Sequence, residues 1–79
     1  MPKASNRSLR TLGERIRAAR KKVGWSQEDL AHYSDIDRSY VGGVERGERN
    51  LTFTILCQIA KALDTDVATL TKGLPGADK

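Results

Sequence analysis

Three consecutive polar residues, Arg38, Ser39 and Tyr40, carry side chains suited to recognising a nucleic acid. An arginine can donate two parallel hydrogen bonds to O6 and N7 of guanine, and a serine or tyrosine hydroxyl can bind a base edge or a phosphate. Asp37, directly before them, is a good helix N-cap, and two valines three residues apart follow on one helical face. The sequence therefore predicts a short helix that buries its apolar face and exposes a polar first turn able to contact DNA.

Residues for catalysis or metal binding are scarce in this chain. His32 is the only histidine and Cys57 the only cysteine, which excludes a Cys-based zinc site and an internal disulfide. No serine, histidine and aspartate stand in a context that supports nucleophilic catalysis. We therefore expect no enzyme activity, no catalytic residue, no metal, no cofactor and no small-molecule ligand. Cys57 is expected to pack as a small, buried or half-buried hydrophobic residue.

A second helix and a turn must position the three polar residues. Ser26 is a good N-cap for this preceding helix, and acidic residues in its first turn suit the positive end of a helix dipole. About three residues, Ser34 to Ile36, separate it from the helix that Asp37 begins. So short a connection is typical of a helix-turn-helix, whose second helix enters the major groove of DNA.

Apolar spacing near the N-terminus predicts another helix, from Leu9 to about Val23. Ser8 can cap this helix and Gly24 can end it. Its core stripe is expected to be Leu9, Leu12, Ile16, Ala19 and Val23. Trp25, the only tryptophan, is expected to pack at the junction between this helix and the Ser26 cap.

Two more helices are predicted in the C-terminal part of the chain. Thr52 can cap a strongly apolar helix that reaches about Leu63, and Asp66 can cap a short helix that Gly73 ends. All five predicted elements are helices, so the fold class is all-α. A chain of 79 residues forms one domain at most, and oligomerisation is a common source of extra buried surface at this size.

Two adjacent glycines lie within the helix that Asp37 begins. Each costs roughly 1 kcal/mol in a helix relative to alanine, so a reason for their presence is needed. We expect Gly43 to allow close packing on a neighbour. We expect Gly42 to point towards the groove, where the lack of a side chain removes a base contact.

Two stretches resemble a known family. Residues 12–31 read L-G-E-R-I-R-A-A-R-K-K-V-G-W-S-Q-E-D-L-A, and residues 37–52 read D-R-S-Y-V-G-G-V-E-R-G-E-R-N-L-T. Together they closely resemble the phage-repressor-like (XRE) helix-turn-helix family, and the second stretch looks most like the controller proteins of restriction-modification systems. The resemblance covers roughly residues 12–70. It implies a five-helix, lambda-repressor-like DNA-binding domain with a central helix-turn-helix.

The resemblance also implies roles for individual residues. Arg20 matches the family's helix-one arginine that pairs with the glutamate after the recognition helix, here Glu45, and two independent surface charges are the alternative. Gln27 matches a glutamine that touches the DNA backbone and supports the recognition helix. Asp35 replaces the usual Gly or Asn of the turn, so we expect a positive φ there, which aspartate tolerates. The expected DNA-binding residues are Gln27, Arg38, Ser39, Tyr40, Arg46, Arg49 and Asn50.

Positive charge is concentrated at the N-terminal end. Residues 1–25 hold eight lysines and arginines against Glu14 alone, within a net charge of +4. A basic excess fits a polyanion partner, and a solvated helix face is the alternative. We expect residues 1–8 to form a flexible basic arm, residues 9–73 the domain, and residues 74–79 a flexible tail. No apolar run approaches the ~18–20 residues of a membrane span and no signal sequence is evident, so a cytoplasmic protein is expected.

These observations favour a sequence-specific, dimeric transcriptional regulator that binds double-stranded DNA at a pseudo-palindromic operator. The resemblance implies an autoregulatory controller of a restriction-modification system. A phage repressor, an antitoxin-type regulator and a protein-binding coactivator module on the same fold are the alternatives. The apolar positions exceed what a lone fourth helix needs, and burial in the protein's own core is the alternative to a dimer interface. The candidate interface residues are Phe53, Ile55, Val67, Leu70 and Leu74.

Overall fold

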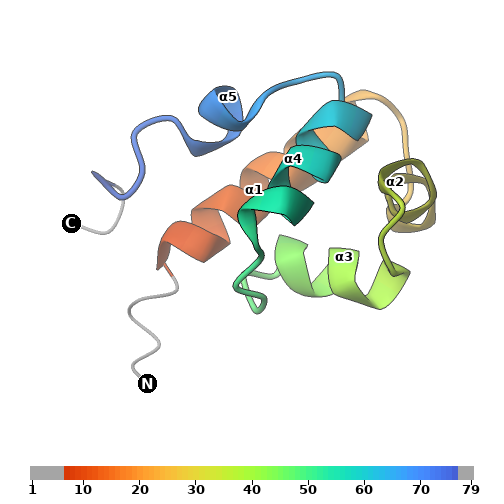
Figure 1. Ribbon diagram of the computed structural model, residues 1–79, viewed down its shortest axis with the longest axis horizontal. Helices are drawn as coiled ribbons and strands as arrows, with labels where there is room; N and C mark the ends of the chain where they lie inside the picture. Colours follow the sequence, from red (N-terminus) through yellow and green to blue (C-terminus); the bar gives the residue numbers. More distant parts are fainter. Residues whose placement is uncertain (1–6, 77–79) are drawn as a thin grey trace.

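The computed structural model describes residues 7–76, which form five helices and no strand (Figure 1). The helices are α1 (Arg7–Lys22), α2 (Gln27–Ser34), α3 (Arg38–Glu45), α4 (Phe53–Ala62) and α5 (Val67–Thr71). In Figure 1, α2 and α3 lie together at one end of the molecule, and α5 lies on the opposite side of α1 from α3. Among the described residues, no helix is long and apolar enough to cross a membrane. The expected all-α fold is therefore confirmed.

The core collects apolar side chains from every helix. Its fully buried members are Ile16, Leu30, Val41, Val44 and Ile59. Val23 was expected in this core but is 48% exposed. Helix α1 ends at Lys22, and Gly24 then turns the chain with a φ of 81°. Val23 therefore leaves the helical stripe on which the expectation rested.

Helix starts follow the predicted caps at four of the five helices. The Ser26 hydroxyl accepts a hydrogen bond from the Asp29 amide, and the Asp29 carboxylate accepts one in return from the Ser26 amide. Asp37 caps α3, Thr52 caps α4 and Asp66 caps α5, each through a side-chain oxygen that accepts a hydrogen bond from a backbone amide of the first turn. These residue types satisfy amides that a helix's own backbone leaves without a partner.

The two ends of the described chain differ from expectation. Helix α1 begins at Arg7, so Ser8 lies within its first turn and is not its N-cap. At the other end, Leu74 is half-buried and packs against the core, although it was expected to begin a flexible tail. The remainder of the predicted arm and tail, residues 1–6 and 77–79, lies outside the described residues.

The turn between α2 and α3 adopts the predicted left-handed conformation. Asp35 has φ 60° and ψ 44°, and its amide donates a hydrogen bond to the His32 carbonyl. The Ile36 amide donates to the Ala31 carbonyl at 3.0 Å. From α4, the Gln58 amide group donates to the Ser34 carbonyl at 3.0 Å. The turn that sets the angle of α3 is thus held by both its own backbone and a neighbouring helix.

Gly13 permits a close approach of α1 to α3 that we did not predict. A Cβ atom added at Gly13 would lie 2.7 Å from the Glu45 carbonyl oxygen and would also collide with that of Val44. Both obstacles are backbone atoms at the end of α3, which cannot swing aside as a side chain can. Gly13 therefore sets how closely α3 packs on the long first helix.

Candidate nucleic-acid interface

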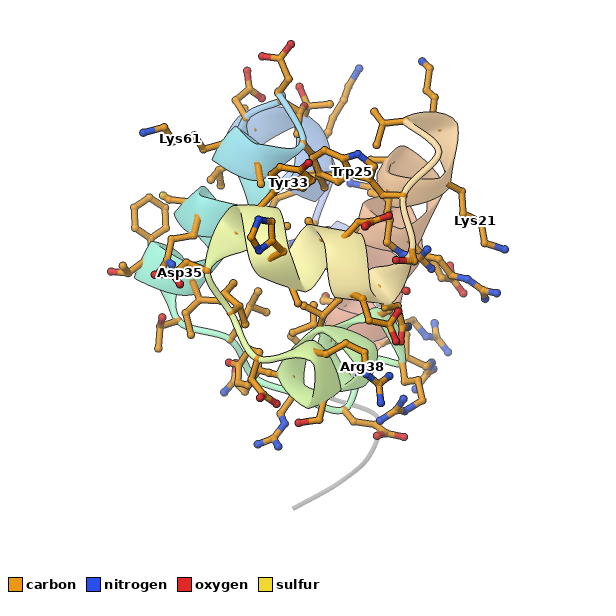
Figure 2. All side chains as sticks on the ribbon, turned by 90° about the vertical axis from the view of Figure 1, so that its right-hand side faces the viewer. Lys21, Trp25, Tyr33, Asp35, Arg38 and Lys61 are labelled. Atoms are coloured by element: carbon orange, nitrogen blue, oxygen red, sulfur yellow. The ribbon has the colours of Figure 1, made fainter. Side chains whose placement is uncertain are left out.

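The first turn of α3 presents Arg38 and Ser39 to solvent. The Arg38 side chain is 52% exposed, and Figure 2 shows it at the surface of α3, away from the core. Val41 and Val44 of the same helix are buried in the core, and their packing holds α3 in place. This part of the predicted interface therefore has the arrangement that a DNA-reading helix requires: an anchored apolar face and an exposed polar turn.

The Ser39 hydroxyl is already engaged within the protein. It donates a hydrogen bond to the Asp37 carboxylate, which also accepts one from the Ser39 amide at 3.1 Å. Both bonds lower the pKa of Asp37, and the bond from the hydroxyl has the larger effect. Because its hydroxyl hydrogen is engaged in the bond to Asp37, Ser39 can offer a DNA base its oxygen lone pairs, which can accept hydrogen bonds from amino groups on adenine or cytosine.

Tyr40 was expected to be exposed with its two neighbours, and this expectation is wrong. The residue is half-buried and packs against the core. The guanidinium carbon of Arg49 lies 5.1 Å from the centre of its ring, a cation–π contact. Position 40 lies on the same helical face as the buried Val44, four residues later, so its ring is drawn partly inward.

Gln27 joins the recognition turn to the buried end of α3. Its side-chain nitrogen donates a hydrogen bond to the Glu45 carboxylate at 3.0 Å. Its side-chain oxygen accepts one from Arg38 at 3.1 Å. This orientation of the amide agrees with the predicted role of Gln27 in supporting the recognition helix.

Arg20 and Glu45 form the ion pair that the family resemblance implied. Arg20 Nε donates to one Glu45 oxygen at 2.7 Å and Nη2 donates to the other at 3.0 Å, a two-point contact. Only 9% of the Arg20 side chain and 2% of the Glu45 side chain is exposed. Because of the hydrogen bond to Glu45, the pKa of the Arg20 guanidinium is raised. A third bond, from Arg20 Nη1 to the Trp25 carbonyl at 2.7 Å, fixes the end of the loop before α2.

The two glycines of α3 lie beneath arginine side chains. Gly43 packs closely on a neighbour, as expected, and the neighbour is Arg49. Gly42 is buried under Arg46 and Gln27, so side chains of the protein itself lie where a side chain at position 42 would project. That the missing side chain removes a base contact stays a prediction.

The remaining predicted DNA contacts are on the loop after α3. Arg46, Arg49 and Asn50 are all exposed, and Arg46 donates a hydrogen bond to the Glu48 carboxylate at 3.0 Å. Sequence reasoning missed Glu28, whose carboxylate lies 3.9 Å from Arg38 Nε. Glu28 directly follows Gln27 in the first turn of α2, and this position could have indicated that its carboxylate lies near Arg38.

The predicted dimer residues do not all lie on the surface. Leu70 is 3% exposed and belongs to the core, so its assignment to an interface is wrong. Leu74, Ile55 and Val67 are all half-buried and pack against the core, whereas Phe53 is 71% exposed. Position 70 faces inward because α5 packs against both α1 and α4.

Cys57 is half-buried, as expected. In the part of the chain that the structure describes, no group of three or more histidine, cysteine, aspartate or glutamate residues could hold a metal ion.

An aromatic contact joins Trp25, just before α2, to Tyr33 near the end of that helix (Figure 2). The two rings are stacked, with their centres 4.6 Å apart. This contact extends the packing that we predicted for Trp25 at the junction before α2.

Comparison with known proteins gives consistent matches. Residues 16–70 match the family described as "Helix-turn-helix". Over 59 residues the chain is 48% identical to control protein C.SmaI of Serratia marcescens, covering 75% of this chain and 70% of that protein. The restriction-modification controller protein C.AhdI from Aeromonas hydrophila has a similar structure, with 48% identity and a TM-score of 0.77 over 78% of this chain and 94% of that one.

A third similar protein has been seen with DNA. The restriction-modification controller protein C.Esp1396I, as a tetramer on its natural 35-base-pair operator, matches with 35% identity and a TM-score of 0.76. The match covers 90% of this chain and 93% of that one.

Proposed function

Since the chain belongs to the helix-turn-helix family, we propose that it is a sequence-specific, dimeric DNA-binding transcriptional regulator. The observation that carries this proposal is the exposed first turn of α3, where Arg38 projects from the fold while its guanidinium is oriented by Gln27. The polarity of this turn favours DNA over a protein partner, whose binding surface is typically rich in aromatic side chains and depleted of charge at its centre.

The similar proteins point to a narrower role. C.SmaI, C.AhdI and C.Esp1396I are control or controller proteins, and the last binds its own operator. We propose that this chain is likewise an autoregulatory controller of a restriction-modification system and that it acts in the cytoplasm. The occupancy of its operator would then rise steeply with the concentration of the protein itself. The reason is that the dimer concentration rises with the square of the monomer concentration while the dimer is scarce.

Each part of the interface has a distinct proposed role. Arg38 reads guanine, and Ser39 accepts from a base amino group or turns its hydroxyl to a phosphate. Because the Tyr40 ring is half-buried, its hydroxyl is the group proposed to reach DNA. The backbone contacts are assigned to Gln27, Arg46, Arg49 and Asn50. Phe53 is proposed as the centre of the dimer interface, to which Ile55 and Val67 also contribute.

Selection of bound fragments from a random DNA pool tests this function. We expect enrichment of a two-fold symmetric site whose half-sites lie about one helical turn apart. The Arg38→Ala variant, selected in parallel, should enrich a less defined sequence at the positions that Arg38 reads. Failure of the unaltered protein to enrich any sequence would overturn the proposed function.

A further inference from the structure

The glycine pair of α3 makes room for two arginine side chains. A Cβ atom at Gly42 would lie 3.1 Å from Nη1 of Arg46, and one at Gly43 would lie 2.8 Å from Cγ of Arg49. At Gly13, by contrast, the obstructing atoms belong to the backbone of another helix. At both glycines of α3 the nearest atom to the added Cβ belongs instead to an arginine side chain, so what the missing side chains accommodate first is arginine.

Spacing explains why Arg46 covers Gly42. Positions 38, 42 and 46 follow one another at intervals of four, so they form a single stripe along α3. With no side chain in the middle of the stripe, the Arg46 guanidinium folds back over position 42. The Gln27 side-chain oxygen, which binds Arg38, lies 3.5 Å from the same added Cβ position. Arg38 and Arg46 thus both lie near the Gln27 side chain.

Each folded arginine has a second contact that holds it. Arg46 Nε donates to the Glu48 carboxylate at 3.0 Å. The stem of Arg49 lies on Gly43 while its guanidinium covers the Tyr40 ring at 5.1 Å. An arginine loses considerable rotamer freedom when it binds DNA, and fixing it beforehand lowers that cost.

We propose that Gly42 and Gly43 are positioning residues of the DNA-binding surface: they seat Arg46 and Arg49 against α3 before DNA arrives. This proposal deepens the proposed function and rests on it. An alanine at either position favours the helix, but its Cβ displaces an arginine: Nη1 of Arg46 by a few tenths of an ångström at position 42, and the stem of Arg49 by more at position 43. The two glycines therefore trade helix stability for ordered guanidinium groups beside Arg38.

Double-mutant cycles test the proposal on the DNA site selected by the unaltered protein. Gly42→Ala should weaken binding by about 2- to 12-fold, the cost of ordering one long side chain. In an Arg46→Ala background the same change should have no further effect. Gly43→Ala should behave likewise towards Arg49→Ala. Gly76→Ala, at an exposed glycine with no atom within 4 Å of an added Cβ, is the control and should leave binding unchanged.

Relaxation measurements on the free protein provide a readout that is independent of DNA. The ¹⁵N heteronuclear NOE of the Arg46 Nε–H should be high in the unaltered chain and lower in Gly42→Ala. The melting temperature of Gly42→Ala should not fall, because alanine is the better helix former and the obstructing guanidinium can move. If Gly43→Ala is less stable than the unaltered protein, its loss of binding could reflect unfolding, and the result for Gly42→Ala then decides the proposal.

Two results would overturn the proposal. The first is a binding result: Gly42→Ala weakens DNA binding equally in the unaltered chain and in the Arg46→Ala variant, or has no effect in either of them. The other is an Arg46 Nε–H that is as mobile in the unaltered chain as in the variant. If the unaltered protein selects no DNA sequence, the proposed function fails, whereas the NOE comparison still decides whether the glycines order the arginines.

Discussion

At the scale of single residues, Arg38 is the side chain that should separate reading of sequence from general affinity for DNA. Replacing Arg38 with alanine should cost ~1–3 kcal/mol on the selected site and much less on scrambled DNA, because a two-point contact to guanine is lost. Lys61→Ala is a matched control, since it removes one positive charge and Figure 2 places it on the opposite side of the molecule from Arg38. Titration of both DNA sequences at one salt concentration measures the effect. Equal losses on both sequences would contradict a base-reading role.

The Arg20–Glu45 pair is expected to be coupled in folding. Removing either partner leaves a buried charge without its counter-ion, at a cost of about 3–5 kcal/mol. The double variant Arg20→Ala/Glu45→Ala should lose clearly less than the sum of the two single losses, because no charge is then left unpaired. Urea denaturation at neutral pH measures all four free energies of unfolding. Additive losses would show that the two charges act independently.

At the scale of helices, the caps of α3 and α5 should make stability depend on acid. Hydrogen bonds from Ser39 lower the pKa of Asp37, and those from Thr69 lower that of Asp66, below the ordinary value of 3.8. A carboxyl whose pKa is lower in the folded chain stabilises the fold above its ordinary pKa. That stabilisation is lost as pH falls through the lowered value.

The melting temperature should therefore fall as the pH is lowered below the ordinary carboxyl pKa of 3.8. Because asparagine caps a helix well without titrating, the Asp37→Asn/Asp66→Asn variant should lose less stability over this range than the unaltered chain. Thermal melts followed by circular dichroism at several pH values provide the comparison. Parallel curves for the two proteins would show that neither cap titrates with folding.

Gly13→Ala should loosen the packing of α1 on α3. The added methyl group would meet backbone oxygen atoms of Val44 and Glu45, so a helix must move, at a cost of about 1–3 kcal/mol. Gly76→Ala, where nothing lies within 4 Å of an added Cβ, should change stability little. The difference between the two midpoints of urea denaturation measures the effect. An undiminished stability of Gly13→Ala would mean that the two helices are not in contact as described.

At the scale of the whole molecule, Phe53 and Leu70 should give opposite results. Phe53 is 71% exposed, so Phe53→Ala should weaken dimerisation and leave the unfolding free energy of the monomer nearly unchanged. Leu70 is 3% exposed, so Leu70→Ala should destabilise the fold by about 2–5 kcal/mol. Sedimentation across a dilution series and denaturation of the dilute protein separate the two effects. A dimer of undiminished strength in Phe53→Ala would remove Phe53 from the interface.

Local features of this chain could be predicted because their causes are local. Ser26, Asp37, Thr52 and Asp66 cap helices through bonds to amides two or three residues away. Asp35 takes a positive φ because the chain must reverse between two helices only a few residues apart. The pairing of Arg20 with Glu45, 25 residues apart, came instead from a family pattern with fixed spacing.

Errors arose where the position of a distant element decided the outcome. Val23 fits the helical stripe but lies beyond the end of α1. Leu70 and Phe53 are equally apolar in the sequence, and only the packing of α5 against α1 and α4 makes one core and the other surface. Tyr40 belongs to a polar stretch of sequence, and only its packing against the core and the position of Arg49 over its ring make it half-buried.

The sequence by itself determined the class of fold, the start of each capped helix, the turn at Asp35 and the polar turn at Arg38, because cap chemistry and apolar periodicity act over a few residues. Only the tertiary structure decided what covers the glycines of α3, how Gln27 orients Arg38 and which leucine is core. These outcomes depend on the angles and distances between helices. Such quantities arise from the packing of the whole chain, and no short stretch of residues encodes them.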